Sequence, residues 1–280
     1  MYRSRSRSGG RRFNGGRILV ALAIAAFSLL SYCSSRSYNP VTDETQYVGI
    51  SPEQEIALGL QAAPEMIQEF GGMDADQQAQ AVLDRVCERL LANSEAGQTE
   101  WPFECTLLAD SQTINAFALP GGQLFITAAL YDQLETEGQL AGVMAHEIGH
   151  VIARHSSQQI AKQKLTEGLT GAAVIATYDP DNPASRQTAQ VAALIGQLVN
   201  MKFGRDDELQ SDRLGVQFMV EAGYDPRAMI QVMEILAAAS QGNQPPEFFS
   251  THPNPDNRIA RIEEAIQEAF PNGVPDGLDQ

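Results

Sequence analysis

The feature that most constrains this chain is the pattern H-E-x-x-H at His146, Glu147 and His150. Residues four apart on an α-helix lie about 40° apart around its axis, so the two imidazoles point toward a common position. Imidazoles placed in this way can bind one zinc ion at about 2.0–2.1 Å. Glu147 is then too distant to bind the metal, but it is close enough to an attacking water to act as general base. We interpret the segment as the metal-binding helix of a zinc peptidase.

The alternative is a chance match on a solvated helix. Two observations disfavour it: the chain has only four histidines, three of them within residues 146–155, and the flanking residues are apolar. Unpaired His and Glu side chains are costly in a buried helix. The apolar neighbours are Leu140, Val143, Met144, Val151 and Ile152.

A zinc peptidase needs a third protein ligand, and His155 is the first candidate. It lies five residues after His150, about 140° around a continuous helix, so its ring is expected to point away from the pair. The extended signature with a third histidine also fails, because Ala153 and Ser156 stand where it needs Gly and His. We expect His155 to be structural or to lie in the shell around the metal ligands.

An acidic residue on a later helix is the second candidate. Glu208 and Asp212 lie four apart in a segment that continues with apolar residues at helical spacing. We expect Glu208 to be the third ligand of a single zinc ion, and Asp212 to accept the free ring N–H of a zinc-bound histidine. Such a run is otherwise an ordinary solvated acidic face, but its pairing with H-E-x-x-H favours ligation.

Three further segments are distinctive: Asn39 to Thr42 with 51–59 (SPEQEIALG), 115–122 (NAFALPGG), and His252-Pro253 followed by Arg258. Together with the H-E-x-x-H helix and the acidic helix, they resemble the membrane-associated gluzincins of metallopeptidase family forty-eight, which include envelope proteases of the HtpX, BepA and LoiP type. The resemblance spans about residues 39–260. It implies an α+β, predominantly helical catalytic domain with a small β-sheet next to the H-E-x-x-H helix. Gly204 and Ser211 depart from the family's Ser and Ala, but they flank the chemistry.

The resemblance also implies roles for two residues near the C-terminus. Arg258 resembles a residue placed to stabilise the tetrahedral oxyanion, and the alternative is a surface salt bridge. His252 matches a histidine that can cap the zinc and hold some periplasmic relatives closed, and its alternatives are a helix cap or a contact with bound substrate. We count both among the catalytic candidates with Glu147.

The N-terminus has the pattern of an export signal. Residues 1–17 hold six arginines and no acid, and residues 18–30 are apolar apart from Ser28. We expect a signal peptide or signal anchor over residues 1–33, a polar tether over 34–48, a peptidase domain over 49–270 and a tail over 271–280. Cys33 allows lipid attachment, although Tyr32 before it is bulky, so lipoprotein and uncleaved anchor both stay open. Either way, the domain is expected on the periplasmic face of a bacterial cell envelope.

Cysteines and charge add two expectations. Cys87 and Cys105 can form a disulfide in an oxidising compartment or stay a buried free pair. Six of the 19 basic side chains lie in the leader, which leaves 13 against 35 acidic ones. This balance argues against nucleic acid and against an anionic membrane surface as partners.

Local patterns place the remaining elements. We expect helices at 52–69 and 75–93, and helical structure over 157–203 broken by a loop at 178–183. A last helix after Asn254-Pro255 should bury Ile259, Ile262 and Ile266. Short strands are expected at 103–108, 116–119 and 123–126, and we expect the last of them to be the sheet edge that pairs with a substrate backbone.

The predicted function is a membrane-tethered zinc metalloendopeptidase that hydrolyses misfolded or unassembled envelope proteins. The alternative is a zinc-dependent, chaperone-like binding module of the envelope with incidental proteolysis. Glu147 disfavours the second hypothesis, because a pure binder has no need of a base there. Physiological substrates, cleavage preference and oligomeric state are not determined by the sequence.

Overall fold

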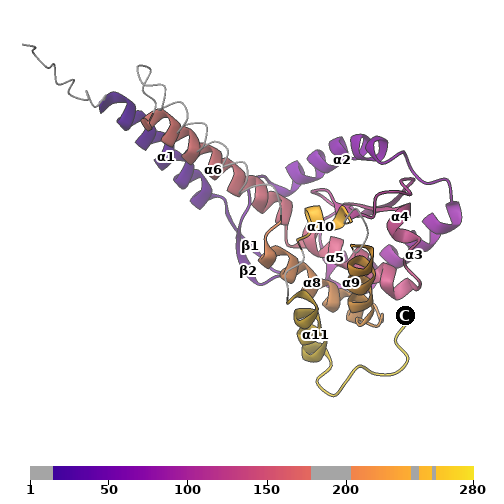
Figure 1. The fold of residues 1–280 in the computed structure, drawn as a ribbon. Helices are drawn as coiled ribbons and strands as arrows, with labels where there is room; N and C mark the ends of the chain where they lie inside the picture. Colours follow the sequence, from indigo (N-terminus) through magenta and orange to yellow (C-terminus); the bar gives the residue numbers. More distant parts are fainter. Residues whose placement is uncertain (1–14, 178–202, 241–245, 254–256) are drawn as a thin grey trace, which may run out of the picture. The chain divides into compact units, whose positions relative to one another are not determined.

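The computed structural model describes residues 15–177, 203–240, 246–253 and 257–280 (Figure 1). The chain divides into two compact units. Of the described residues, one unit comprises 15–34 and 163–177, and the other comprises 35–162, 203–240, 246–253 and 257–280. The expected interruption at 178–183 lies outside the described residues.

The first unit contains helix α1, Gly15–Ser34, and the later part of helix α6, His155–Thr177. The two helices pack closely, since a Cβ added to Gly168 would meet the Ser28 hydroxyl. Many large apolar side chains of α1 are exposed, among them Leu19, Leu22, Phe27 and Leu30. Within the described residues, α1 is the one helix long and apolar enough to cross a membrane. Its 20 residues exceed the 13-residue apolar run of the sequence.

In the second unit, the helices α2 (Pro52–Glu69) and α3 (Gln77–Asn93) form where the sequence predicts them. Ser51 and Gln54 make the expected capping box at the start of α2. Asp76 caps α3 by accepting the backbone N–H groups of Gln78 and Ala79. A short 3-10 helix, η1 (Glu95–Gln98), follows.

A three-stranded sheet follows, made of β3 (Glu104–Leu108), β4 (Ala116–Ala118) and β5 (Gln123–Thr127). The strand order is β3-β5-β4, with β3 parallel and β4 antiparallel to β5. The prediction that residues 123–126 form a sheet edge is therefore wrong. Because β5 is paired on both sides, the edge strands are β3 and β4.

The segment expected as a polar tether contains regular secondary structure. Residues 36–47 form a β-hairpin of β1 (Arg36–Asn39) and β2 (Glu44–Tyr47). Asn39 is buried and donates from Nδ2 to the Ile152 carbonyl at 2.7 Å, which fixes the hairpin to the end of the metal-binding helix. The structural unit therefore starts at residue 35, earlier than position 49.

The core surrounds helix α5 (Glu137–Ile152), which lies amid the other elements of this unit (Figure 1). Around it lie α4 (Ala128–Tyr131), α8 (Arg205–Glu221), α9 (Ala228–Ala239), α10 (Phe248–Thr251) and α11 (Arg258–Ala269). In α11, Ile262 and Ile266 are buried as predicted, but Ile259 is 39% exposed. The architecture is α+β and predominantly helical, as the sequence predicts.

Two long-range ties close the unit. Cys87 and Cys105 form a disulfide that joins α3 to β3. The residues predicted as a free C-terminal tail return to the domain, where Asp279 accepts from Arg89 and bridges to Tyr224. Residues 271–280 are thus partly integrated into the domain.

Candidate metal centre

Helix α5 presents His146, Glu147 and His150 from its C-terminal half. Its N-terminus is capped by Thr136, whose hydroxyl accepts the Gln139 backbone N–H. Every residue from Gly138 to Ile152 is buried, so these three polar side chains lie inside the core.

Helix α8 approaches α5 closely because two glycines and a serine lie at the contact. A Cβ on Gly149 would lie 2.9 Å from the Ser211 carbonyl oxygen, and one on Gly215 would lie 3.3 Å from the backbone nitrogen of His146. The Ser211 hydroxyl donates to the His146 carbonyl at 2.5 Å. The serine that departs from the family pattern thus joins the two helices. The close packing carries Glu208, at the start of α8, to the histidine pair.

Four buried side chains bring one donor atom each to a common position: His146, His150, Glu208 and His252. These atoms all lie within 4.8 Å of one another. The Nε2 atoms of His146 and His150 are 3.0 Å apart. His150 Nε2 lies 3.4 Å from Glu208 Oε1, and His146 Nε2 lies 3.5 Å from Glu208 Oε2. His252 Nδ1 lies 3.1 Å from Glu208 Oε1 and 3.4 Å from His146 Nε2.

These separations fit a tetrahedral metal. Ligand atoms about 2.0–2.1 Å from a central zinc ion are about 3.3 Å apart at the edges of a tetrahedron. Four edges of a tetrahedron built on Glu208 Oε1 range from 3.0 to 3.4 Å, and His146 Nε2 lies 3.5 Å from the other oxygen, Oε2. Glu208 Oε2 is buried and makes no hydrogen bond, and among the charged groups near it is Arg258, with Nη1 at 3.2 Å. The residues present therefore fit a zinc ion.

His252 approaches from a different element than the other three residues. It ends α10 and stacks on Phe248, with ring centroids 4.5 Å apart. Its Nδ1 occupies the fourth corner of the cluster, which a peptidase with three protein ligands leaves to water. Its Nε2 lies 3.6 Å from Glu147 Oε1.

Glu147 differs from the other acidic residues of the site. It is fully buried, and neither carboxylate oxygen has a hydrogen-bond partner. Burial raises the pKa of Glu147 above the ordinary value, and the neighbouring His252 and His146 oppose this shift. A carboxylate in this state accepts a proton readily from a water next to it.

Asp212 and Arg258 form a buried pair behind His146. Asp212 Oδ1 lies 2.9 Å from His146 Nδ1, and the carboxylate accepts Arg258 Nε and Nη2 at 2.7 and 2.9 Å. Arg258 Nη1 lies 3.2 Å from Glu208 Oε2. Arg258 is 1% exposed, so a surface salt bridge, one of its two predicted roles, is excluded.

The protonation of the site follows from burial and from these contacts. Burial raises the pKa of Glu208, but hydrogen bonds from His146, His150 and His252 outweigh it and hold that pKa well below the usual range. Burial and Arg258 lower the pKa of His146, whereas Asp212 and Glu208 raise it to about 9. Burial lowers the pKa of His150 well below its ordinary value. The His150 lone pair is therefore available to a metal.

His155 lies where the sequence argument does not place it. The ring contacts His150, with the two Nδ1 atoms 2.9 Å apart. The angular estimate assumed a continuous helix, but α5 ends at Ile152 and Arg154 has a φ of 55° before α6 begins. No Gly or Pro marks this break in the sequence. Gln210 accepts a hydrogen bond from His155, and no local pattern in the sequence indicates this contact.

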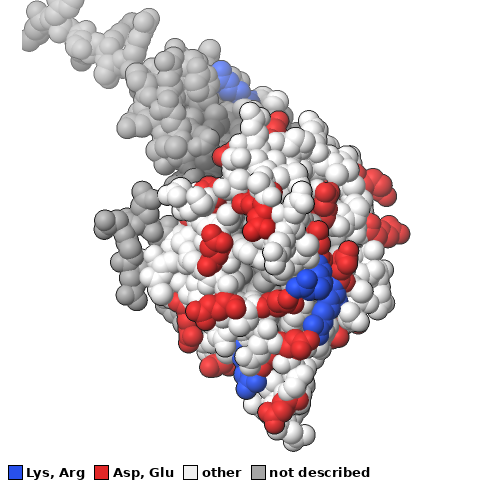
Figure 2. Space-filling view, turned by 90° about the vertical axis from the view of Figure 1, so that its right-hand side faces the viewer, with Lys and Arg blue, Asp and Glu red and all other residues white. Residues whose placement is uncertain are grey.

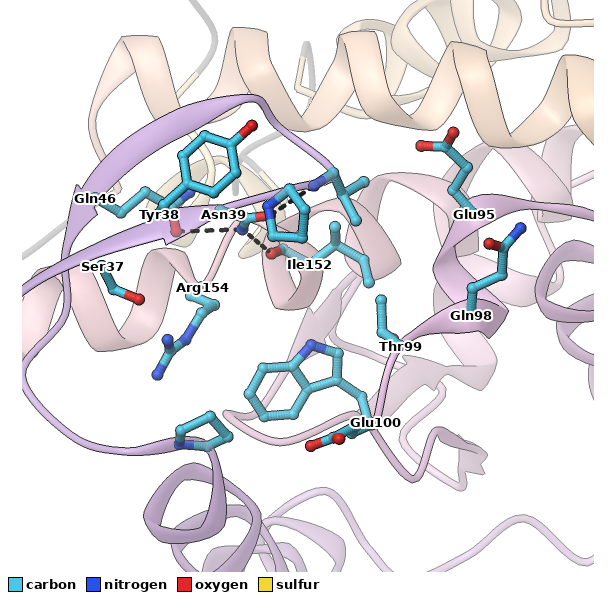
Figure 3. Close-up of a pocket in the computed structure, with 14 residues that line it drawn as sticks. Ser37, Tyr38, Asn39, Gln46, Glu95, Gln98, Thr99, Glu100, Ile152 and Arg154 are labelled. Atoms are coloured by element: carbon cyan, nitrogen blue, oxygen red, sulfur yellow. Dashed lines mark hydrogen bonds between the residues drawn. The ribbon is translucent and has the colours of Figure 1, made fainter.

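A separate cavity of about 450 Å³ lies between the hairpin, the segment around η1 and the end of α5 (Figure 3). Trp101 and Arg154 are among its lining residues. Asn39 and Ile152, which share a hydrogen bond, also line it. None of the donor atoms of the metal cluster lines it. On the face of the molecule in Figure 2, acidic side chains are spread widely, and basic ones lie in a central group and in smaller places near the top and the bottom of the view.

An H-E-x-x-H helix, combined with a third metal ligand that is a carboxylate on a following helix, defines a metallopeptidase of the gluzincin class. The profile of Peptidase family M48 matches residues 77–266, which contain all four donor residues. The chain belongs to this family, whose metal is zinc.

Two relatives illustrate the range of similarity. The chain is 34% identical over 197 residues to the beta-barrel assembly-enhancing protease of Escherichia coli K12, a match covering 66% of this chain and 39% of that protein. It is 30% identical over 250 residues to the mitochondrial metalloendopeptidase OMA1 of Schizosaccharomyces pombe, covering 88% and 71%. The bacterial relative therefore has more than half of its length outside the match.

Proposed function

We propose that this protein is a membrane-tethered zinc metalloendopeptidase that cleaves misfolded or unassembled proteins of the cell envelope. The observation that supports the peptidase reaction best is the unpaired, buried Glu147 carboxylate beside a tetrahedral set of donor atoms. A binding module needs the donors alone, whereas hydrolysis also needs a base at this position.

His146, His150 and Glu208 are the proposed zinc ligands. When bound, zinc polarises the scissile carbonyl and lowers the pKa of the attacking water. Glu147 takes the proton of that water on a carboxylate oxygen and passes it to the leaving amine. Asp212 holds the proton of His146 on Nδ1, so that Nε2 keeps its lone pair for the metal. Arg258 holds Asp212 in turn and is a weaker candidate for the oxyanion, because its N–H groups already face two carboxylates.

His252 is proposed to hold the resting enzyme closed. Its Nδ1 lies at the corner where a substrate carbonyl or water must enter, so the ring has to leave before catalysis. His252→Ala should raise the basal cleavage of casein without lowering the zinc content. A rate equal to or below wild type would reject this gating role and leave the peptidase assignment intact.

Substrate is proposed to pair with β4, the edge strand nearest α10. The Phe248 backbone N–H donates to the Ile114 carbonyl just before β4, which ties this edge to the element that carries His252. Backbone pairing along an edge is largely indifferent to side chains, so unfolded segments are the expected substrates. Ala118→Pro removes one outward-facing backbone donor from this edge, because the pairs on either side of it are the ones hydrogen-bonded to β5, and it should lower kcat/KM for casein.

The membrane and the envelope enter the proposal through α1 and the relatives. The exposed apolar side chains of α1 suit a lipid environment better than water. The bacterial relative is by name a beta-barrel assembly-enhancing protease, which supports unassembled envelope proteins as the substrate class. Membrane fractionation of the full chain tests whether it is anchored. A reporter of cleavage at Cys33 then distinguishes a lipoprotein, which is cleaved, from an uncleaved anchor.

The decisive experiment compares the full-length, detergent-solubilised protein with Glu147→Gln and Glu208→Ala. We expect casein cleavage and one zinc per chain in the wild type, zinc without cleavage in Glu147→Gln, and loss of zinc in Glu208→Ala. Stoichiometric zinc in Glu208→Ala would reject the third ligand. Binding of unfolded protein with no cleavage by the zinc-loaded wild type would favour the chaperone-like alternative.

A further inference from the structure

His155 makes a hydrogen bond with His150 that the proposed chemistry does not use. We propose that His155 is a positioning residue that fixes the tautomer and ring orientation of His150, and that it begins a hydrogen-bond chain ending at Glu44 on the β1–β2 hairpin. This inference rests on the proposed role of His150 as a zinc ligand. It concerns the chain's own residues on the side of the ring away from the metal.

The junction between α5 and α6 is built to make this contact. Arg154 has a φ of 55°, a left-handed conformation that costs a non-glycine residue about 1 kcal/mol or more. Its guanidinium holds the turn by donating to the Glu55 carboxylate and to the Ile50 carbonyl. Without this turn a continuous helix would point His155 away from His150. A strained residue held by two partners is therefore what brings the rings together.

The distances allow one consistent assignment of protons. His150 Nε2 faces the metal cluster and needs its lone pair, so the ring proton is on Nδ1 and is donated to His155 Nδ1 at 2.9 Å. His155 then carries its own proton on Nε2 and donates it to Gln210 Oε1 at 2.9 Å. Gln210 Nε2 in turn donates to Glu44 Oε2 at 2.7 Å. Reversing any link would set two donors or two lone pairs against each other.

A neutral acceptor at position 155 also suits the charge of the site. Glu147, Glu208 and Asp212 are three buried carboxylates, balanced by the Arg258 guanidinium and the two charges of a zinc ion. His146 already uses a carboxylate, Asp212, as its partner. A second carboxylate behind His150 would leave an uncompensated buried anion, which is costly. Imidazole accepts the same hydrogen bond without adding charge.

The far end of the hydrogen-bond chain lies on the β1–β2 hairpin, which is itself attached to α5. Glu44 lies on β2, and the partner strand is fixed to α5 by Asn39, whose side chain bonds both Gln46 and the Ile152 carbonyl (Figure 3). The hairpin is therefore linked to the metal-binding helix in two ways. Asn39 bonds directly to the Ile152 carbonyl, and Glu44 is connected to His150 through Gln210 and His155. Outer partners of metal-bound histidines orient the ring and raise metal affinity.

The first test needs no substitution. In the full-length, zinc-loaded protein with 15N-labelled histidine, the four histidines give few ring signals. We expect a slowly exchanging His150 Nδ1–H with scalar coupling to a second imidazole nitrogen. A zinc-loaded protein in which His150 Nδ1–H exchanges rapidly and shows no such coupling would overturn the proposal.

The second test measures zinc dissociation into a chromogenic chelator. His155→Leu keeps an apolar side chain but no acceptor, and should speed zinc release by about 10- to 100-fold. His155→Asn places Oδ1 where Nδ1 was, so release should return close to the wild-type rate. Wild-type release in His155→Leu would overturn the proposal, and so would equal acceleration in both variants. Gln210→Leu should accelerate release to a smaller extent, and an unchanged rate there would overturn the part beyond His155.

These outcomes are separable from failure of the proposed function. A wild-type protein without bound zinc would reject the metallopeptidase assignment itself. A zinc-loaded, active wild type with an indifferent His155→Leu variant would reject the positioning role alone. The unfolding temperature of each metal-free variant shows whether a fast release reflects the hydrogen bond or a general loss of structure.

Discussion

Replacing Gly149 by alanine tests how closely the metal centre depends on the spacing of α5 and α8. The added Cβ would lie 2.7 Å from the Ser211 hydroxyl and 2.9 Å from its carbonyl oxygen. The hydroxyl can rotate away, but the carbonyl belongs to the α8 backbone. Ordinary contacts between carbon and a carbonyl oxygen begin at about 3.3 Å, so α8 must move by about 0.4 Å.

This displacement acts directly on the third ligand. Glu208 lies three residues before Ser211 on the same helix, and its oxygens lie 3.4 and 3.5 Å from the two histidine nitrogens. Widening both by about 0.4 Å takes them to about 3.8 and 3.9 Å, well above the edge of about 3.3 Å that a tetrahedral zinc ion requires. We expect zinc affinity to fall by about 10- to 100-fold. The fold should survive, because overpacking costs about 1–3 kcal/mol while alanine gains about 1 kcal/mol in helix propensity.

Competition with a chromogenic chelator measures the affinity, and thermal unfolding of the metal-free protein measures the fold. Gly142→Ala is the matched control in the same helix, since its Cβ would meet the flexible Met229 side chain at 3.1 Å and no backbone atom closer than 3.5 Å. Wild-type zinc affinity in Gly149→Ala would refute the reasoning. An equal loss in Gly142→Ala would attribute the effect to helix crowding in general.

Three other outcomes are expected. Glu147→Gln should keep zinc and lower kcat by about 10²-fold or more, because it removes a base and no ligand, and near-normal cleavage would contradict this role. Replacing Cys87 and Cys105 by serine should lower the free energy of unfolding by about 3 kcal/mol for a loop of 18 residues, measured by denaturant titration against the wild type under non-reducing conditions. Arg227 lowers the pKa of Asp225, so this pair stabilises the fold above about pH 4 and the contribution is lost as the pH falls further. Asp225→Asn should therefore lower the unfolding temperature at pH 7 and have less effect near pH 3, and a difference independent of pH would reject that role.

Sequence patterns predict what depends on local periodicity. The metal-binding helix, the capping box at Ser51 and the start of α8 follow from residue spacing alone, and these elements bring Glu208 and Asp212 to the histidines. Strand order does not follow, because each strand pattern is local and pairing is a property of the whole sheet. The pattern of residues 123–126 is equally compatible with an edge strand and with a central strand, and the structure places them in the central strand.

Other errors have the same origin. The polar residues 34–48 look like a tether, because the buried side of the hairpin consists of Asn39 and Gln46, which are satisfied only by long-range partners. The two roles left open for Arg258 could not be separated for a similar reason, since its partners Asp212 and Glu208 lie about 50 residues earlier in the chain. The burial of a polar residue can be predicted from a sequence only when its hydrogen-bond or ion-pair partner is already known.

The hairpin changes how far this protein can search for substrate. A flexible tether of 15 residues would let an anchored domain wander with a root-mean-square reach of about 20 Å. Instead, α1 ends at Ser34 and β1 begins at Arg36, which leaves one residue of slack. With α1 as the proposed anchor, one residue of chain, and not fifteen, separates the end of the anchor from the first strand of the catalytic unit. Unfolded polypeptides must then diffuse to the enzyme, which favours clients that themselves stay close to the membrane.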